Sequence, residues 1–97
     1  MSTSIFLLNF TEKGAKNIKG SPKRGSDFIK IAEKFGVQIK GMYWTIGGYD
    51  GVLIIDAPNE EAAATLSFSL EQSGNVRTTP LRAFTRAEFE TILANLD

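Results

Sequence analysis

The 97-residue sequence contains no cysteine and no histidine. Without cysteine the chain has no disulfide framework, no thiolate catalysis, no Cys-ligated zinc and no iron–sulfur cluster. Without histidine it has no Ser-His-Asp triad, no His-ligated metal and no haem on a proximal histidine. The acidic residues are scattered without calcium-loop spacing. We therefore expect no metal and no cofactor, and the remaining chemistry must use Asp, Glu, Lys, Arg, Tyr, Ser or Thr.

Long apolar runs are also missing. No stretch approaches the roughly 18–20 apolar residues of a membrane span. The first apolar run, Ile5–Leu8, is short and has no basic segment before it, so it does not resemble a secretory signal. We expect a single domain over residues 1–97, located in the cytoplasm and without a membrane partner.

The chain has no net charge, because eleven basic side chains balance eleven acidic ones. The balance is uneven along the chain: residues 1–40 carry an excess of +5 and residues 41–97 an excess of −5. Such asymmetry indicates either an interaction surface or two solvated faces. Zero net charge gives no general attraction to nucleic acid, and the basic segment lacks an aromatic stacking surface, so we expect no nucleic-acid partner.

Hydrophobic periodicity and capping residues predict seven elements of secondary structure. Thr11 can cap one helical turn within a basic loop that extends to Gly20, and the proline at position 80 marks an edge strand or a bulge. Gly25 weakens the first long helix, so that helix begins either at Ser21-Pro22, with Ser21 as the cap, or near Ser26. The seven expected elements are four strands, at 4–10, 37–46, 49–56 and 76–84, and three helices, which follow Ser21, Asn59 and Thr85. A Gly47-Gly48 turn joins the middle two strands.

The order β-α-β-β-α-β plus a terminal helix predicts an α+β fold, a ferredoxin-like sandwich with a short C-terminal helix. In this topology both crossover helices cover one face of the sheet. The other face is also apolar, since Ile5 and Leu7 alternate with Phe6 and Leu8 along the first strand. We expect the terminal helix to cover part of this second face and a homodimer or higher homo-oligomer to cover the rest.

The segment Tyr43-Trp44-Thr45-Ile46-Gly47-Gly48-Tyr49-Asp50 resembles the signature of the GYD family, which is named for the tripeptide at its end. Further blocks at Thr11–Gly14, Lys19–Arg24, Ala57-Pro58 and Gly74–Thr79 are similar to other parts of that family. The resemblance covers residues from about 4 to 90. It implies a dimeric α+β barrel and no particular reaction, because the family is a domain of unknown function.

The basic segment 13–24 is the most informative candidate site. Lys19, Lys23 and Arg24 lie just before or within the first turn of the helix that starts at Ser21. Because that end of a helix is already positive, basic side chains there point to a compensating anion, which is a ligand or an acidic surface of a neighbouring subunit. The other reading is a solvated loop that carries charge for solubility.

Four further residues complete the candidate set. Tyr43 could line a ligand cleft or an interface. Tyr49 and Asp50 are the best acid–base candidates in a chain without histidine, although Asp50 could instead bond the turn backbone or pair with Arg77. Arg77, with Thr78 and Thr79, resembles a small anion clamp.

Two hypotheses for function follow. The first is a homo-oligomeric small-molecule-binding protein, with a pocket between sheet and helices for an anionic or carbonyl-bearing metabolite. Its ligand-binding candidates are Lys19, Arg24, Tyr43, Asp50 and Arg77, and enzymatic activity through Tyr49 or Asp50 stays open. The second is a non-catalytic structural or regulatory oligomerisation module.

Overall fold

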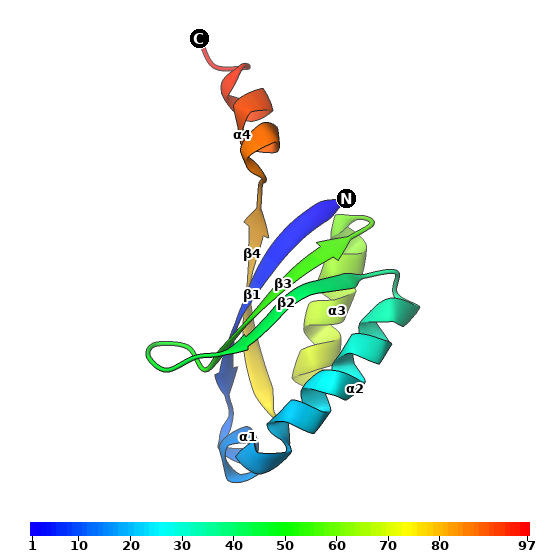
Figure 1. The fold of residues 1–97 in the computed structure, drawn as a ribbon, viewed down its shortest axis with the longest axis vertical. Helices are drawn as coiled ribbons and strands as arrows, with labels where there is room; N and C mark the ends of the chain where they lie inside the picture. Colours follow the sequence, from blue (N-terminus) through cyan, green and yellow to red (C-terminus); the bar gives the residue numbers. More distant parts are fainter.

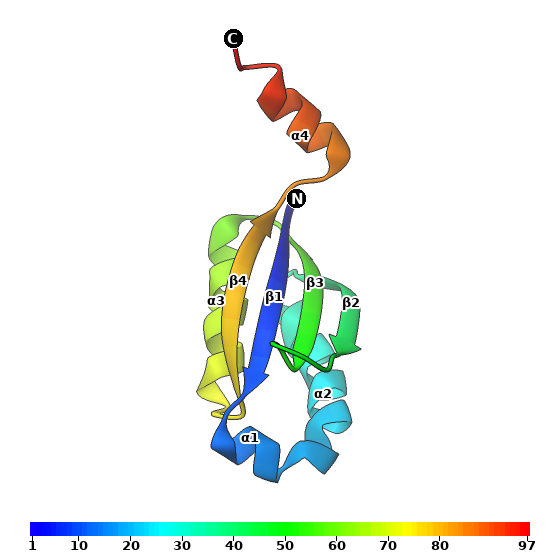
Figure 2. The ribbon, with the colours of Figure 1, turned by 90° about the vertical axis from the view of Figure 1, so that its left-hand side faces the viewer.

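A computed structural model describes all 97 residues, Met1–Asp97, as a four-stranded antiparallel sheet with its main helices on one face (Figure 1). The strand order is β2-β3-β1-β4, which confirms the ferredoxin-like α+β prediction. Figure 2, turned by 90° about the vertical axis from Figure 1, looks onto the sheet with α2 and α3 behind it. The elements are β1 (Ser2–Phe10), α1 (Glu12–Lys16), the 3₁₀ turn η1 (Ile18–Gly20), α2 (Ser21–Lys34), β2 (Gln38–Trp44), β3 (Gly51–Ala57), α3 (Glu60–Gln72), β4 (Val76–Ala83) and α4 (Arg86–Leu93).

The hydrophobic core lies between the sheet and the helices α2 and α3. Phe6, Leu53 and Ile55 point from the central strands into this layer, where they meet Ala32 of α2 and Leu66 of α3. Because successive strand residues point to opposite faces, the intervening residues form a second face that no helix covers. This open face presents Ile5, Leu7, Val52, Ile54 and Leu81. No helix of the structure has the length and apolarity needed to cross a bilayer.

Strand β2 departs from the regular alternation expected over 37–46. Its pairing with β3 shifts between Ile39 and Gly41, so that Lys40 forms a bulge. Ile39 and Met42 therefore share the helix-covered face, whereas regular alternation places them on opposite faces. The bulge aims Met42 and Trp44 at α2, which determines the shape of the candidate site described below.

Helix α2 begins at Ser21, which agrees with the predicted start at Ser21-Pro22 and not with a start near Ser26, although Ser21 is not the cap. The turn η1 leads directly into α2, so Ser21 already has helical dihedral angles and Gly20 is the cap residue. Gly25 lies inside the helix, and its missing side chain makes room for β2. A Cβ atom at this position would lie only 2.8 Å from the sulfur of Met42.

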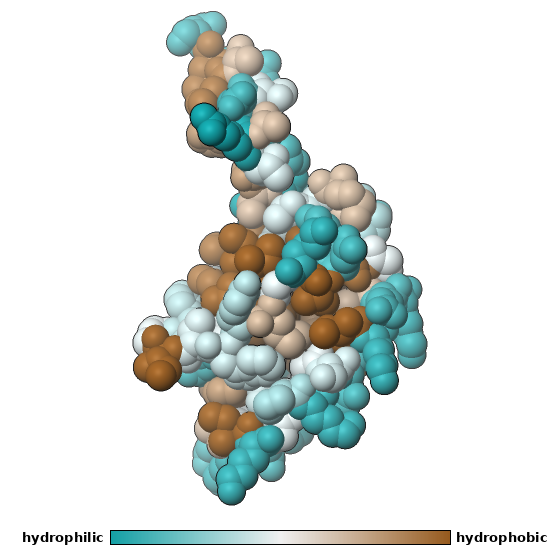
Figure 3. Space-filling view, in the orientation of Figure 1, coloured by the Kyte–Doolittle hydropathy of each residue, from teal (hydrophilic) through white to brown (hydrophobic).

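The two middle strands are joined by a six-residue loop, residues 45–50, and not by the tight Gly47-Gly48 turn expected from the sequence. The loop is closed at its base by the Thr45 backbone N–H, which donates to the Asp50 carbonyl at 2.9 Å. The Thr45 hydroxyl adds a 2.6 Å hydrogen bond to the Tyr49 carbonyl. At the outer end, the side chain of Ile46 is fully exposed, and Figure 3 shows an apolar tip there.

Helix α4 projects away from the sheet (Figures 1 and 2), which contradicts the expectation that it covers part of the open face. Its start is as predicted: Thr85 and Glu88 form a capping box. Its apolar stripe of Phe89, Ile92 and Leu93 is largely exposed. With this projecting arm, formed by α4, the molecule measures 51 × 31 × 18 Å. Amphipathic patterning predicted the helix correctly but did not specify the surface on which its stripe packs.

Candidate functional site

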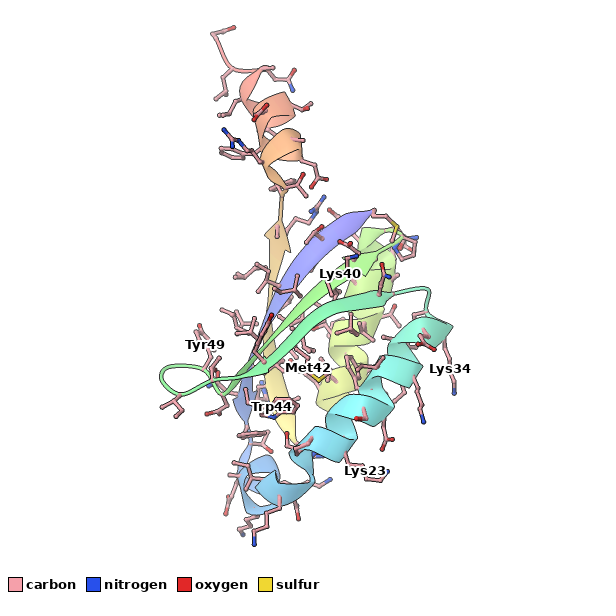
Figure 4. The ribbon with its side chains drawn as sticks, in the orientation of Figure 1. Lys23, Lys34, Lys40, Met42, Trp44 and Tyr49 are labelled. Carbon is pink, nitrogen blue, oxygen red and sulfur yellow. The ribbon has the colours of Figure 1, made fainter.

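A cavity of about 260 Å³ lies between the helix-covered face of the sheet and helices α2 and α3. Figure 4 shows Met42 and Trp44 in the space between β2 and α2, whereas Lys23 and Lys34 extend from the outer side of α2. The walls are mainly apolar and come from Leu8, Phe10, Phe28, Ile31, Met42, Leu53, Leu70 and Val76. The polar side chains on the lining are fewer and include Ser21, Arg24, Asp50 and Asn75.

Arg24 is the cation of this cavity. Its Nη1 donates a 2.8 Å hydrogen bond to the Asn17 carbonyl, which fixes the guanidinium against the turn before α2. Its Nη2 is buried and has no hydrogen-bond partner in the protein. Buried polar groups are nearly always paired, so an unpaired guanidinium nitrogen beside a cavity marks a place for an acceptor. The guanidinium fork is suited to a carboxylate or phosphate oxygen.

Asn75 borders the same cavity from the turn before β4. Its residue surface is only 9% exposed, and its backbone carbonyl accepts the Thr11 N–H at 3.0 Å. The side-chain amide of Asn75 takes part in none of the protein's hydrogen bonds and remains available to a ligand. Sequence reasoning missed Asn75, because an asparagine after a helix-ending glycine is typical of a turn.

A second, open groove adjoins the cavity and is strongly basic. Lys13, Lys16 and Lys19 line it, and Arg24 and Asn75 border both spaces. Two of the predicted ligand residues, Lys19 and Arg24, are therefore brought into one surface. Lys23 is not part of the groove. Its ammonium pairs with Asp27 at 3.2 Å, as the ammonium of Lys16 pairs with Glu12 at 3.4 Å. Lysines at the mouth of a cavity attract anions and raise their local concentration.

The wall between β2 and α2 is closed by a hydrogen bond. The indole Nε1 of Trp44 donates to the Ser21 hydroxyl at 2.9 Å. The ring of Trp44 also lies against Gly25, where a Cβ atom would be 3.5 Å from it. This places the chain's one tryptophan on the lining of the cavity, so its fluorescence can report on a bound ligand.

Asp50 borders the cavity and also holds two strands in place. Its Oδ2 accepts the Phe10 N–H at 2.8 Å, and its own N–H donates to the Leu8 carbonyl at 2.8 Å. Its Oδ1 accepts no hydrogen bond from the protein and forms no ion pair. The expected pairing with Arg77 is absent, because Arg77 lies on the open face opposite Asn9. The alternative bond to the turn backbone is replaced by a bond to β1.

The remaining candidates lie apart. Tyr43 borders the cavity, but its side chain is on the open face and is 60% exposed. Tyr49 lies in the exposed loop outside the cavity lining (Figure 4). Arg77 is on β4 opposite Asn9 and is not on the cavity lining.

The proposed clamp of Arg77, Thr78 and Thr79 does not form, because consecutive strand residues point to opposite faces. Thr78 faces the helices, where its backbone N–H and hydroxyl donate to the Glu71 carboxylate at 3.1 and 2.8 Å. These bonds hold the pKa of Glu71 below its ordinary value. Glu71 and Thr78 thus fasten α3 to the edge strand and leave no clamp for a ligand.

Comparison with known proteins gives one family and one named relative. The sequence model described as the GYD domain matches residues 5–93. A protein of Thermus thermophilus named "Glutamine synthetase and cystathionine beta-lyase binding protein" is 30% identical over 89 residues, which cover 91% of this chain and 94% of the relative. No solved structure matches the chain.

Proposed function

This chain belongs to the GYD domain family, and we propose from its cavity that it binds a small anionic or carbonyl-bearing metabolite between the sheet and helices α2 and α3. The observation that carries the proposal is the buried Nη2 of Arg24, which has no partner in the protein. A buried donor without an acceptor costs about 1–3 kcal/mol, and more when it is charged, and a ligand oxygen that reaches this nitrogen would recover that cost.

The shape and lining of the cavity narrow the ligand further. Its volume of about 260 Å³ is below the roughly 300–1,000 Å³ of pockets for drug-sized molecules, which favours a small metabolite. The apolar walls of Phe28, Ile31 and Leu53 favour a ligand with an apolar body behind its anionic group. Asp50 remains the acid–base candidate that borders the cavity, while Tyr49 lies outside it.

A panel of carboxylates tests this proposal by the fluorescence of Trp44. We expect 3-phenylpropionate and 4-methylpentanoate to bind, and inorganic phosphate without an apolar body to bind more weakly. Arg24→Gln should weaken binding by about 10- to 100-fold, as expected for loss of a charge-assisted hydrogen bond. Arg77→Gln is the matched control, because it removes a guanidinium from the open face. Equal binding by wild type and Arg24→Gln would refute the assignment.

We propose in addition that two copies pair through their open faces. The uncovered residues Ile5, Leu7, Val52, Ile54 and Leu81 would form an apolar patch of a kind that monomers seldom expose. The apolar stripe of α4 likewise finds nothing to pack on within its own chain. A second copy supplies both surfaces by symmetry, since a two-fold interface pairs each patch with its counterpart.

Light scattering after size exclusion tests the pairing. The chain has a mass of 10.6 kDa, and we expect the eluting species to have twice that mass at micromolar protein concentration. Leu81→Asp places a charge on the open face and should give a folded monomer. Asp27→Asn, on α2 and away from the open face, should leave the mass unchanged. A wild-type protein that elutes as a monomer would contradict the proposal.

A protein-binding module is the second candidate function, and the observation that favours it is the printed name of the Thermus thermophilus relative. The surface for such a partner is the same open face, so the partner would replace the second copy there. Titration calorimetry with glutamine synthetase and with cystathionine β-lyase of the same organism would test it. Binding that Leu81→Asp abolishes favours this candidate, whereas binding of neither enzyme, together with Arg24-dependent carboxylate binding, favours the first.

A further inference from the structure

We propose that the ligand of the cavity is a zwitterion, an α-amino acid with an apolar side chain, whose carboxylate binds Arg24 and whose ammonium group binds Asp50. The inference rests on the proposed function, because it names the class of ligand for the same cavity. It draws on a feature that the proposed function leaves unused: beside Arg24 the cavity is bordered by Asp50, which forms no ion pair in the protein, while Asp27, the other acid of the lining, pairs with Lys23.

The two charges border one cavity without neutralising one another. Arg24 has its buried Nη2 free, and Asp50 has its Oδ1 free. The structure contains no ion pair between the two side chains. Each is held by another bond, Arg24 by the Asn17 carbonyl and Asp50 by the Phe10 N–H, so neither swings freely toward the other. A ligand with both signs of charge satisfies both groups at once.

The polar groups are gathered at one end of the layer. Asp50 directly precedes β3, Asn75 directly precedes β4, and Phe10, which is bonded to Asp50, ends β1. Arg24 is in the first turns of α2, which starts beside the same end of the sheet (Figure 1). The headgroup of an amino acid, with its carboxylate and ammonium on one carbon, therefore has donors and acceptors around it.

The apolar lining continues from this polar end along the helix. Phe28 and Ile31 follow Arg24 on α2 by one and two turns, and Leu53 lies two residues into β3. A side chain attached to the headgroup would lie among these residues. The cavity thus has the polarity of an amphipathic ligand, with charge at one end and hydrocarbon at the other.

Asp50, at the polar end of the cavity, favours a zwitterionic ligand over a simple anion. A monocarboxylate bound to Arg24 brings a second negative charge near Asp50, and a phosphate or dicarboxylate brings more. The ammonium group of an amino acid replaces that repulsion with a charge-assisted hydrogen bond. It also leaves the occupied cavity with no net charge added, which reduces the cost of burying the ligand.

Two series of probes test the inference by calorimetry and by Trp44 fluorescence. L-phenylalanine is compared with 3-phenylpropionate, which lacks the ammonium, and with 2-phenylethylamine, which lacks the carboxylate. L-leucine is compared with 4-methylpentanoate and 3-methylbutylamine. We expect each amino acid to bind at least tenfold more tightly than either relative, as for a gained charge-assisted hydrogen bond.

Asp50→Asn is the decisive variant, because an amide oxygen can still accept the Phe10 N–H while the charge is lost. We expect it to weaken L-phenylalanine about tenfold or more and to leave 3-phenylpropionate unchanged or tighter. Asp56→Asn is the matched control, since the Asp56 carboxylate also accepts one hydrogen bond, from the Thr3 hydroxyl at 2.8 Å, but Asp56 lies outside the cavity lining. Thermal unfolding of each variant checks that it is folded.

The outcomes separate the two proposals. If 3-phenylpropionate binds as tightly as L-phenylalanine and Arg24→Gln weakens both, the zwitterion is refuted and the anion cavity stands. If Asp50→Asn weakens the acid and the amino acid equally, Asp50 acts only through the strand contact and the zwitterion is again refuted. If no probe binds at millimolar concentration, both the zwitterion and the carboxylate form of the proposed function are overturned.

Discussion

We expect a large loss of stability when one methyl group is added at Gly14, as in Gly14→Ala. It is buried in α1, directly against the backbone of the turn before β4. A Cβ atom here would overlap the Asn75 carbonyl oxygen and lie 2.9 Å from the Asn75 carbonyl carbon. The neighbour cannot yield cheaply, because it is backbone and because the Thr11 N–H and hydroxyl hold this turn at Asn75 and Gly74.

The magnitude follows from the two ways of relieving the overlap. Forcing an extra carbon into a packed site costs about 1–3 kcal/mol. If α1 moves away instead, the two bonds from Thr11 are lost at about 0.5–1.5 kcal/mol each. Either route gives a loss of about 1–3 kcal/mol for Gly14→Ala. For a chain of this length, 2 kcal/mol lowers the melting temperature by roughly 8–16 °C.

The assay is urea unfolding of wild type, Gly14→Ala and Gly48→Ala at one protein concentration. Gly48 is the matched control, because a Cβ atom there meets no atom within 4 Å and its φ is not positive. We expect Gly48→Ala to stay within about 0.5 kcal/mol of wild type. If Gly14→Ala is equally neutral, the packing of α1 against this turn is not as described and the reasoning fails.

Three further predictions concern the core, the pH dependence and the cavity wall. Leu66→Ala in the buried layer should cost about 2–5 kcal/mol in urea unfolding, whereas Phe68→Ala, on the exposed side of the same helix, should cost less than about 0.5 kcal/mol. The bonds from Thr78 lower the pKa of Glu71 below its ordinary 4.5, so the stability that the Glu71 carboxylate contributes is complete above pH 4.5 and is lost as the pH falls through the lowered pKa. Glu71→Gln should therefore flatten the acid limb of a profile of melting temperature against pH. An unchanged acid limb would assign the loss of stability to other carboxylates. Trp44→Phe removes the donor that joins β2 to α2 and should cost about 1 kcal/mol in thermal unfolding, with no loss expected if that bond is replaced by water.

The strand and helix pattern could be predicted from the sequence, because apolar periodicity and capping residues are local signals. The bulge at Lys40 could not, because the next residue is Gly41, which has no side chain to show which face it occupies. Regular alternation then fits the sequence as well as the shifted register. What selects the shifted register is contact between Met42, Trp44 and α2, which depends on the assembled fold.

The site could be predicted in part. Arg24 follows from local charge, since a basic group at a helix start calls for an anion. Asp50 and Arg77 have opposite charges, so the sequence allowed them to pair, but Arg77 lies on the open face of β4 and the Asp50 carboxylate accepts the Phe10 N–H instead. Asn75 became a candidate only when its amide proved to have no partner, a property that the type of residue does not reveal.

The projecting arm makes the order of the C-terminal end depend on its surroundings. Helix α4 spans eight residues, Arg86–Leu93, and isolated helices shorter than about 12–15 residues are marginal in water. The capping box at Thr85 and the ion pair between Arg86 and Glu90 support its first turns, but its apolar stripe stays largely exposed. The helical content of these residues therefore measures how much of the protein has its stripe in contact with another molecule, and it rises with protein concentration when that molecule is a second copy.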